Sequence, residues 1–289
     1  MTRPGAVWPV GETRLCAVIG DPVRHSLSPV LHNAAYAALD LDWAYVALPV
    51  GAGDAPQAIM GARALGIRGL SVTMPHKETA FALADTRSPH AERLAAANCL
   101  VFAGDKVHAE ANDGVALLDD LHDAGFDPDG AVTAVIGAGG AARSVVLALG
   151  SAGAAEVIVV NRTAERAARA AALAGRAGRV GTLEDLGRAE LVVQATPLGM
   201  AGGASDEAGA ARARAFGARL SAGQFAYDCI YHPQRPPFLE AAAASGARTR
   251  NGIGMLVHVA AHQFAAYTGE MAPLPAMWAA VTDAGYRPD

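Results

Sequence analysis

A glycine-rich segment between two short apolar runs is the feature that most constrains the fold of this chain. Val132–Ile136 has the pattern of a buried strand, and the segment Gly137–Ala142 (GAGGAA) follows it directly. A helical pattern of small residues comes next, and then a second apolar run at Val157–Val160. The spacing G-x-G-x-x-A lets the backbone turn sharply, lets a pyrophosphate approach it, and lets the helix pack closely on the sheet. The segment therefore predicts a strand–turn–helix–strand unit that binds a dinucleotide, the alternative being a plain glycine turn in an alanine-rich α/β protein.

The residues after the second apolar run bear on the choice of dinucleotide. A cofactor without a 2′-phosphate usually meets an Asp or Glu at this point. This chain has Asn161, Arg162 and Thr163 there, with Arg166 one helical turn further on. The strand end has no carboxylate that would repel a phosphate, and a guanidinium group can bind a phosphate bidentately. The pattern favours NADP over NAD, unless both arginines are ordinary surface charges at the start of a helix.

Composition narrows the class of protein. The 289 residues are enough for two domains, and a hydrophobic content of 52% is enough to build their cores. A net charge of −5 without a basic block gives no sign of a nucleic acid or an acidic membrane surface as a partner. No apolar run approaches the ~18 residues that span a bilayer, and the N-terminus lacks a signal-peptide core. We therefore expect a soluble cytoplasmic protein.

The three cysteines point in the same direction. Cys16, Cys99 and Cys229 are too few and too scattered for a disulfide framework or a zinc site. Each lies in or beside an apolar run, so we expect buried thiols and no bound metal.

Strands and helices alternate along the chain, which is typical of an α/β protein. We predict strands at Leu15–Gly20, Trp43–Pro49, Cys99–Phe102, Lys106–Ala109, Leu191–Ala195 and Phe225–Ile230. We predict helices at Val30–Leu39, Ala55–Leu65, Pro89–Ala97, Val115–Ala124, Pro237–Ala244, Met255–Tyr267 and Pro275–Ala284. Ala201–Gly209, rich in Gly, Ala and Ser, indicates a mobile loop.

Polar residues stand at two strand-to-helix junctions in the N-terminal part. Ser26 and Ser28 come just before a helical pattern and can form a small cradle for an anion or a carboxylate. Taken alone, Ser28 is more often a helix cap than a ligand. Ser71 and Thr73 share one face of an extended segment. Lys77 follows in the first turn of a helix, where the dipole disfavours a cation, so it is either functional or an ordinary solvated lysine.

Nine motifs occur in one order along the chain and are specific as a set. They are Gly20–Asn33 (GDPVRHSLSPVLHN), Ser71–Lys77 (SVTMPHK), Ala97–Asn98, Asn112–Gly114 (NDG), Gly137–Ala142, Asn161–Thr163, Ala195–Met200 (ATPLGM), Asp228–Pro233 (DCIYHP) and Gly252–Leu256 (GIGML). On these motifs the chain resembles the shikimate dehydrogenase family over nearly its full length. The resemblance implies a two-domain α/β fold. Residues 1–114, completed by C-terminal helices in 252–289, would bind substrate, and residues 115–251 would form a Rossmann-type NADP-binding domain. The site would lie in the cleft between them.

The resemblance also implies a role for each matching residue. Ser26 and Ser28 would hold the substrate carboxylate, and Ser71, Thr73, Asn98 and Tyr231 would contact the ring hydroxyls or the carboxylate. Lys77 and Asp113 would be the catalytic pair. Gly137, Ala138, Gly139, Gly140 and Ala141 would take the pyrophosphate, and Asn161, Arg162, Thr163 and Arg166 the adenosine ribose phosphate. Thr196, Cys229 and Gly252 would approach the nicotinamide.

The implied reaction is the reversible NADP-dependent reduction of 3-dehydroshikimate to shikimate, on the chorismate pathway of aromatic amino-acid biosynthesis. Hydride reduction of a ketone puts negative charge on its oxygen, which needs a positioned proton donor. A charged Lys77 can supply the proton, and a carboxylate at Asp113 would favour that charged form. Oxidation of the alcohol needs neutral Lys77, so we expect that direction to speed up with pH.

Three positions depart from the family pattern. Ser71 stands where the family often has Asn, and Gln194 replaces the Asn common before Ala-Thr. Val259 stands where the family usually places a Gln that hydrogen-bonds the substrate, and loss of one such bond costs roughly 0.5–1.5 kcal/mol. His258, next to it, points about 100° away around the helix and is a poor substitute.

Val259 leaves alternatives open. In the first alternative the protein is a paralogue that acts on quinate or an aminoshikimate, since Val259 gives the substrate site an apolar wall in place of the expected amide. A nucleotide-binding regulator without catalysis is another, although the presence of both Lys77 and Asp113 argues against it. A homodimer is one assembly that the resemblance allows.

Overall fold

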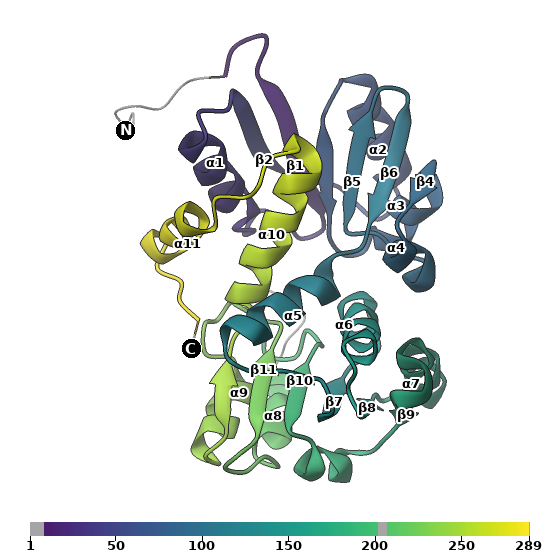
Figure 1. Cartoon of the computed structure of the whole chain (residues 1–289), viewed down its shortest axis with the longest axis vertical. Coiled ribbons are helices and arrows are strands. Elements are labelled where there is room, and N and C mark those ends of the chain that lie inside the picture. Colours follow the sequence, from purple (N-terminus) through teal and green to yellow (C-terminus); the bar gives the residue numbers. More distant parts are fainter. Residues whose placement is uncertain (1–8, 202–206, 289) are drawn as a thin grey trace. The chain divides into compact units, whose positions relative to one another are not determined.

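The computed structural model describes residues 9–201 and 207–288, and these divide into two compact units. The first unit contains the described residues up to Ala111 together with Ala260–Ala284. The second contains Asn112–Val259 and the described residues from Gly285 on. Helix α10 (Ile253–Thr268) therefore contributes its first turns to the second unit and its last turns to the first (Figure 1).

The first unit is built on a mixed six-stranded sheet in the order β2-β1-β3-β5-β6-β4. Its strands are β1 (Arg14–Gly20), β2 (Trp43–Pro49), β3 (Gly69–Val72), β4 (Thr86–Arg87), β5 (Cys99–Ala103) and β6 (Lys106–Glu110). Its helices are α1 (Ser28–Ala38), α2 (Ala55–Ala64), α3 (Lys77–Leu83), α4 (Pro89–Leu94) and α11 (Leu274–Asp283), with the end of α10. Strand β1 runs parallel to both of its neighbours and is buried from Cys16 to Gly20, as expected for a parallel strand covered on both faces.

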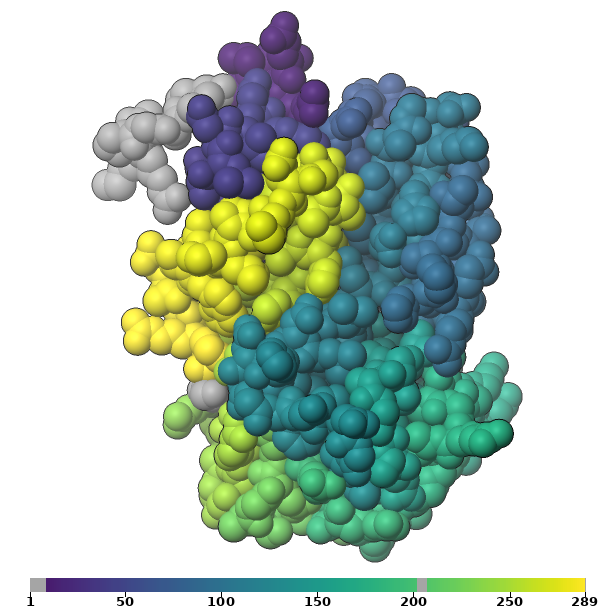
Figure 2. Space-filling model, in the orientation of Figure 1, coloured from purple at the N-terminus to yellow at the C-terminus, as the bar shows by residue number. Residues whose placement is uncertain are grey.

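Helices cover both faces of this sheet. On one face, Ile59 of α2 and Ala80 of α3 pack against Ile19 and Leu70 in an apolar cluster. On the other face, Tyr36 of α1 packs against Phe264 of α10, with ring centroids 5.5 Å apart. Figure 2 shows α11 and the end of α10, both yellow, beside the dark blue residues of α1. The C-terminal helices are thus an integral layer of the first unit.

The second unit contains an all-parallel six-stranded sheet in the order β12-β11-β10-β7-β8-β9. Its strands are β7 (Val132–Ile136), β8 (Glu156–Val160), β9 (Gly178–Val180), β10 (Leu191–Gln194), β11 (Phe225–Asp228) and β12 (Arg248–Arg250). Its α-helices are α5 (Asp113–Asp123), α6 (Gly140–Ser151), α7 (Ala164–Ala171), α8 (Glu207–Gly217) and α9 (Pro237–Ala244), and two 3₁₀ helices span Ala172–Ala177 and Leu183–Arg188. The central strands are almost wholly buried and mostly apolar, because both of their faces are covered.

The sequence-based α/β prediction is confirmed, with errors in short elements. The range 202–206 of the predicted loop lies outside the described residues, and its end is wrong because Glu207–Gly209 begin helix α8. Glycines at both ends of α8 hid its helical pattern. The short strands β4, β9 and β12, with two or three residues each, are too brief to show a period. Among the helices in the described part of the chain, none combines the length and apolar character needed to cross a membrane.

Candidate active site

The glycine turn after β7 has the shape that a dinucleotide requires. Gly137 adopts φ +121°, and a Cβ there would lie 3.0 Å from the Ala195 carbonyl oxygen and 3.1 Å from Thr196 Cγ2. Gly139, in contrast, has ordinary extended backbone angles, and a Cβ there would meet nothing within 4 Å. Helix α6 begins at the next residue and buries Ala142 completely. The first glycine is therefore needed for the turn, while the second leaves open space beside the N-terminus of the helix.

The end of β8 presents the two arginines singled out in the sequence. Asn161 Nδ2 donates to the Thr163 carbonyl at 3.0 Å and stabilises the turn into α7. Glu165, the nearest carboxylate in this helix turn, pairs with Arg169 at 3.2 Å. Arg162 and Arg166 are exposed, and neither has an ion-pair partner among the residues that the structure describes. These two guanidinium groups fit a 2′-phosphate.

A buried glutamine joins two loops at the end of the parallel sheet. Gln194 Oε1 accepts from the Thr196 backbone N–H at 2.5 Å and from its hydroxyl at 2.6 Å. Its Nε2 donates to the Leu198 carbonyl at 3.2 Å and lies 3.4 Å from Asp228 Oδ1. Asp228 Oδ1 also accepts from the Ile230 N–H at 3.0 Å. Burial raises the pKa of Asp228 well above its ordinary value. Gln194 thus shapes the Thr196 loop as a supporting residue.

Gly252 brings a third loop to the same edge. A Cβ at Gly252 would lie 2.3 Å from the Cys229 carbonyl oxygen, so no larger residue fits. Cys229 itself is half-buried, whereas Cys16 and Cys99 are buried as predicted. Thr196, Cys229 and Gly252 follow β10, β11 and β12, and Gly137 follows β7. The carboxyl ends of parallel strands share one edge of a sheet, so these residues gather where α/β proteins bind ligands.

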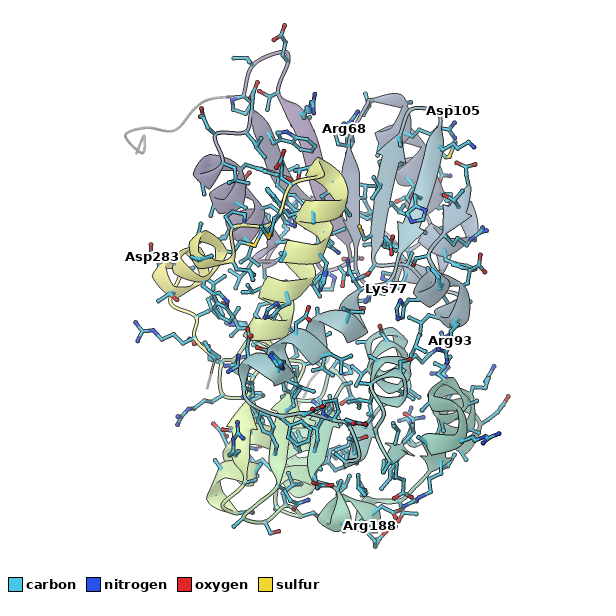
Figure 3. The ribbon with its side chains drawn as sticks, in the orientation of Figure 1. Arg68, Lys77, Arg93, Asp105, Arg188 and Asp283 are labelled. Carbon is cyan, nitrogen blue, oxygen red and sulfur yellow. The ribbon has the colours of Figure 1, made fainter. Side chains whose placement is uncertain are left out.

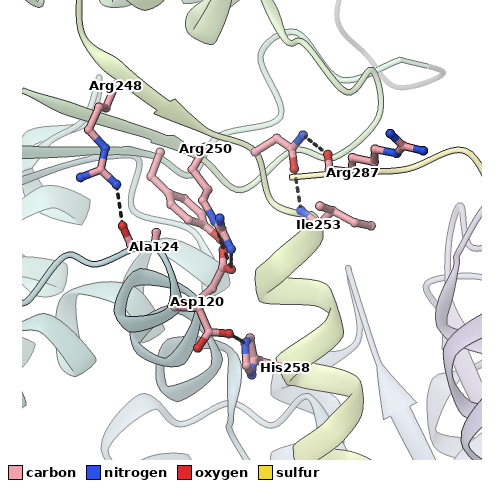
Figure 4. Close-up of polar contacts among 10 residues, drawn as sticks. Asp120, Ala124, Arg248, Arg250, Ile253, His258 and Arg287 are labelled. Carbon is pink, nitrogen blue, oxygen red and sulfur yellow. Dashed lines mark hydrogen bonds and ion pairs between the residues drawn. The ribbon is translucent and has the colours of Figure 1, made fainter. Parts of the chain in front are cut away.

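Helix α5, which begins with Asp113, is held at both ends within the second unit. The Gly114 N–H donates to Ser144 Oγ of α6 at 2.9 Å, and a Cβ at Gly114 would lie 2.2 Å from the Ser144 carbonyl oxygen. Near the other end, buried Asp120 forms an ion pair with Arg250 and accepts from the Tyr227 hydroxyl at 2.6 Å (Figure 4). Asp113 is therefore the first residue of a helix with little freedom to shift.

Val259, the departure in α10, and its neighbour His258 both take part in the packing of the second unit. His258 Nε2 lies 2.9 Å from Asp123 Oδ2, so its ring is committed to α5 (Figure 4). Val259 packs against the apolar cluster that contains Met255 and Leu117. Sequence reasoning missed Asp120, Arg250 and Ser144, because ion pairs and hydrogen bonds between distant segments leave no local pattern.

In the first unit, the serine pair differs from the cap prediction. Helix α1 begins at Ser28, and the residue in the cap position is Leu27, which makes no side-chain cap. Instead the Ser28 N–H donates to Ser26 Oγ at 3.2 Å, and the two hydroxyls lie 3.1 Å apart. The helix-cap interpretation of Ser28 is wrong because the helix starts one residue too early for it. Two hydroxyls side by side at a helix N-terminus suit a carboxylate.

Lys77 and Thr73 lie beyond the carboxyl end of β3. Thr73 is fixed by its N–H, which donates to the Ile19 carbonyl of β1 at 3.0 Å. Lys77 is the first residue of α3, and its carbonyl accepts from the Ala97 N–H at 2.9 Å. Figure 3 shows Lys77 at the end of this sheet opposite to Arg68 and Asp105. Lys77 is half-buried, so a hydrated surface lysine is a poor description of it.

Ser71 and Asn98 are buried in the first unit and share a neighbour that sequence reasoning missed. Gln263 of α10 contacts the Ser71 hydroxyl, and its Nε2 donates to the Asn98 carbonyl at 3.0 Å. Gln263 lies one helical turn after Val259, a spacing that could have drawn attention to it. Tyr231, the remaining predicted contact, lies in the second unit, where its ring meets that of Tyr286 edge-on at 6.1 Å. Within residues 9–201 and 207–288, no group of three or more His, Cys, Asp or Glu could hold a metal ion.

Comparison with known proteins gives these features a context. The family model described as shikimate dehydrogenase substrate binding domain matches residues 18–100, and the model described as shikimate / quinate 5-dehydrogenase matches residues 123–197. The curated shikimate dehydrogenase (NADP(+)) of Moorella thermoacetica is 38% identical over 276 residues, which is 92% of this chain and 92% of that protein.

Solved structures agree along nearly the whole chain. A shikimate dehydrogenase in complex with NADP+ has a TM-score of 0.87 at 31% identity and covers 98% of this chain and 99% of its own. The Thermus thermophilus shikimate 5-dehydrogenase in complex with NADP(H) and shikimate has a TM-score of 0.83 at 32% identity, over 94% of this chain and 99% of its own. With both family models matched and relatives of this identity aligned over more than nine-tenths of its length, the chain belongs to the shikimate dehydrogenase family.

Proposed function

We propose that this protein is an NADP-dependent oxidoreductase that reversibly reduces 3-dehydroshikimate to shikimate. The observation that carries the proposal is the end-to-end likeness to NADP+-dependent shikimate dehydrogenases, in a chain that has both Lys77 and Asp113 at helix starts. We assign the first unit to the substrate and the second to the cofactor. The reaction belongs to aromatic amino-acid biosynthesis, which we place in the cytoplasm.

The second unit offers a fitting place for NADP. The backbone of Gly137–Ala141 would bind the pyrophosphate at the N-terminus of α6, where the helix dipole favours negative charge. Arg162 and Arg166, with Asn161 and Thr163, would bind the ribose 2′-phosphate. Thr196, Cys229 and Gly252 would line the nicotinamide end, at the edge where β10, β11 and β12 finish. When bound, the reduced cofactor supplies the hydride.

The first unit would orient the substrate and move the proton. Ser26 and Ser28 would hold the carboxylate, and Thr73 and Asn98 would contact the ring or the carboxylate. Tyr231, which lies in the second unit, would make a further contact of this kind. As the ketone oxygen gains negative charge, Lys77 Nζ would donate a proton to it. Asp113 would favour the charged lysine and take part in returning the proton in the oxidation direction.

A spectrophotometric assay tests this function directly. Purified protein is given shikimate or quinate with NADP or NAD, and formation of the reduced cofactor is followed by its absorbance. We expect fast turnover with shikimate and NADP and much slower turnover in the other three combinations. Turnover with quinate alone, or with NAD alone, would contradict the proposed substrate or cofactor respectively. Light scattering of the same sample tests whether the assembly is a homodimer.

A further inference from the structure

A polar cluster is enclosed in the first unit, on the face of the sheet that α10 covers. The Ser71 cluster consists of Tyr45, Ser71, Asn98, Gln263 and Tyr267, and none of these residues is more than 5% exposed. They come from β2, β3, the residue before β5, and α10. The proposed chemistry uses Asn98 from this cluster but assigns nothing to Gln263. Buried polar groups are costly unless they are paired, so the pairing pattern of the cluster carries information.

The hydrogen-bond directions in the cluster follow from donor and acceptor chemistry. The backbone carbonyl of Asn98 can only accept a hydrogen bond, so the group of Gln263 that lies 3.0 Å from it must be Nε2. Gln263 Oε1 therefore faces the Ser71 hydroxyl and, because it can only accept, it takes the Ser71 proton. The Tyr45 hydroxyl donates to Ser71 Oγ, and the Tyr267 hydroxyl lies 3.2 Å from the same oxygen.

Ser71 Oγ is consequently occupied on all sides. A serine hydroxyl has one proton and two lone pairs. Its proton goes to Gln263, and the two tyrosine hydroxyls face its lone pairs. No hydrogen-bonding position on Ser71 is left for a substrate hydroxyl. Ser71 therefore links Tyr45, Gln263 and Tyr267 inside the first unit. This role differs from the direct contact with substrate that the family resemblance implies for Ser71.

The backbone of Asn98 is held by the same glutamine. Its carbonyl accepts from Gln263 Nε2 and from the Val72 N–H at 2.8 Å, and its own N–H donates to the Glu110 carbonyl at 3.0 Å. Both lone pairs of the carbonyl are thus used, and the backbone is fixed between β3 and β6. The direction in which the Asn98 side chain leaves the backbone depends on these three bonds.

We propose that Gln263 is a positioning residue for substrate binding: it holds the Asn98 backbone and closes the Ser71 hydroxyl, so that Asn98 meets the substrate in one orientation while Ser71 does not touch it. The proposal rests on the proposed function, since it concerns binding of the same substrate. Its physical basis is that the side-chain amide of Gln263 is oriented by Ser71 through its oxygen and holds the Asn98 backbone through its nitrogen.

The test compares Gln263→Met, Ser71→Ala and the double variant with the wild-type enzyme. Methionine keeps the length of the side chain and removes both hydrogen bonds. Gln57→Met is the matched control, because Gln57 is an exposed residue of α2 in the same unit. Steady-state constants for shikimate and for NADP, the dissociation constant of shikimate by calorimetry, and the melting temperature are measured for each.

We expect Gln263→Met to raise KM and Kd for shikimate about tenfold, the upper end for one neutral hydrogen bond, with kcat and the KM for NADP within about twofold. Ser71→Ala should raise the same constants, and the double variant should match Gln263→Met because the two residues act in series.

A lower melting temperature with unchanged shikimate constants would mean a purely structural role and overturn the proposal. A large effect of Ser71→Ala without one of Gln263→Met would restore direct contact by Ser71. If the wild-type enzyme itself does not turn over shikimate, it is the proposed function that fails.

Gln263→Glu serves if the methionine variant does not fold. A protonated glutamate can donate to the Asn98 carbonyl, whereas an ionised one repels it, so the shikimate KM of this variant should rise with pH relative to wild type. Four buried titratable groups near it, Tyr45, Tyr267, Cys99 and His32, stay uncharged in the neutral range. Burial raises the pKa of Tyr45 and Tyr267 well above their ordinary values and that of Cys99 to about 12, and it lowers the pKa of His32 to about 3. A pH profile parallel to that of wild type would contradict the role of Gln263.

Discussion

In the second unit the proposed cofactor residues are held by backbone shape, whereas in the first unit the proposed substrate residues are held by side-chain hydrogen bonds. Gly137 and Gly252 act by lacking a side chain, which lets the chain turn or approach its neighbour closely. Asn98, in contrast, depends on Gln263, which lies far away in the sequence. A site built from backbone recognises groups common to all dinucleotides. A site built from side chains can distinguish hydroxyl positions on a ring, and it can be altered by a few substitutions.

The largest effect should come from Lys77, the proton donor of the proposed reaction. We expect Lys77→Met to lower kcat by about 10²–10⁴-fold, the usual contribution of a proton donor, with a melting temperature close to wild type. Lys106→Met is the control, since Lys106 is exposed on β6. Initial rates with shikimate and NADP measure the effect. A variant with wild-type turnover would remove Lys77 from the chemistry.

The two glycines of the turn should separate folding from binding. Gly137→Ala places a side chain at φ +121° against the Ala195 carbonyl, so it should destabilise the fold by about 1–3 kcal/mol as well as weaken NADP binding. Gly139→Ala meets open space in the protein, so it should leave the melting temperature unchanged and raise the KM for NADP. Thermal melts and NADP titrations of the two variants make the comparison. Equal effects on stability would show that the turn is not organised as described.

The smallest effect concerns Asp228, where the second unit does rely on a buried side chain. Its folded pKa is raised by burial, so the folded state keeps the proton more tightly than the unfolded one. The stability it contributes is full below the ordinary Asp range and is lost as pH rises through the raised folded pKa. Asp228→Asn cannot ionise and keeps an acceptor for the Ile230 N–H. We therefore expect the melting temperature of wild type to fall relative to this variant as pH rises. A constant difference across pH would show that Asp228 does not titrate on unfolding.

Local patterns predict much of this protein because they reflect local physics. The apolar run Val132–Ile136 forms β7 with the predicted bounds, and Trp43–Pro49 and Pro237–Ala244 do the same for β2 and α9. The sequence left open whether Ser28 caps helix α1, and only the structure shows that the helix already begins at Ser28. Hydrophobic periodicity does not locate the start of a helix to within one residue. Val259 illustrates a different failure: the sequence records that an expected amide is absent there, but not that the side chain packs against an apolar cluster.

The sequence by itself determined the α/β class and the dinucleotide turn, since each depends on neighbours within a few positions along the chain. Its nine ordered motifs indicated the family, and the candidate residues followed from that resemblance. Only the tertiary structure decided that Gln263 meets Ser71 and Asn98, and that Arg250 and Tyr227 hold Asp120 on α5. These partners are separated by more than a hundred residues in the chain. Hydrogen bonds and ion pairs depend on distance and direction in space, and no spacing in the sequence encodes a contact that forms only when the chain has folded.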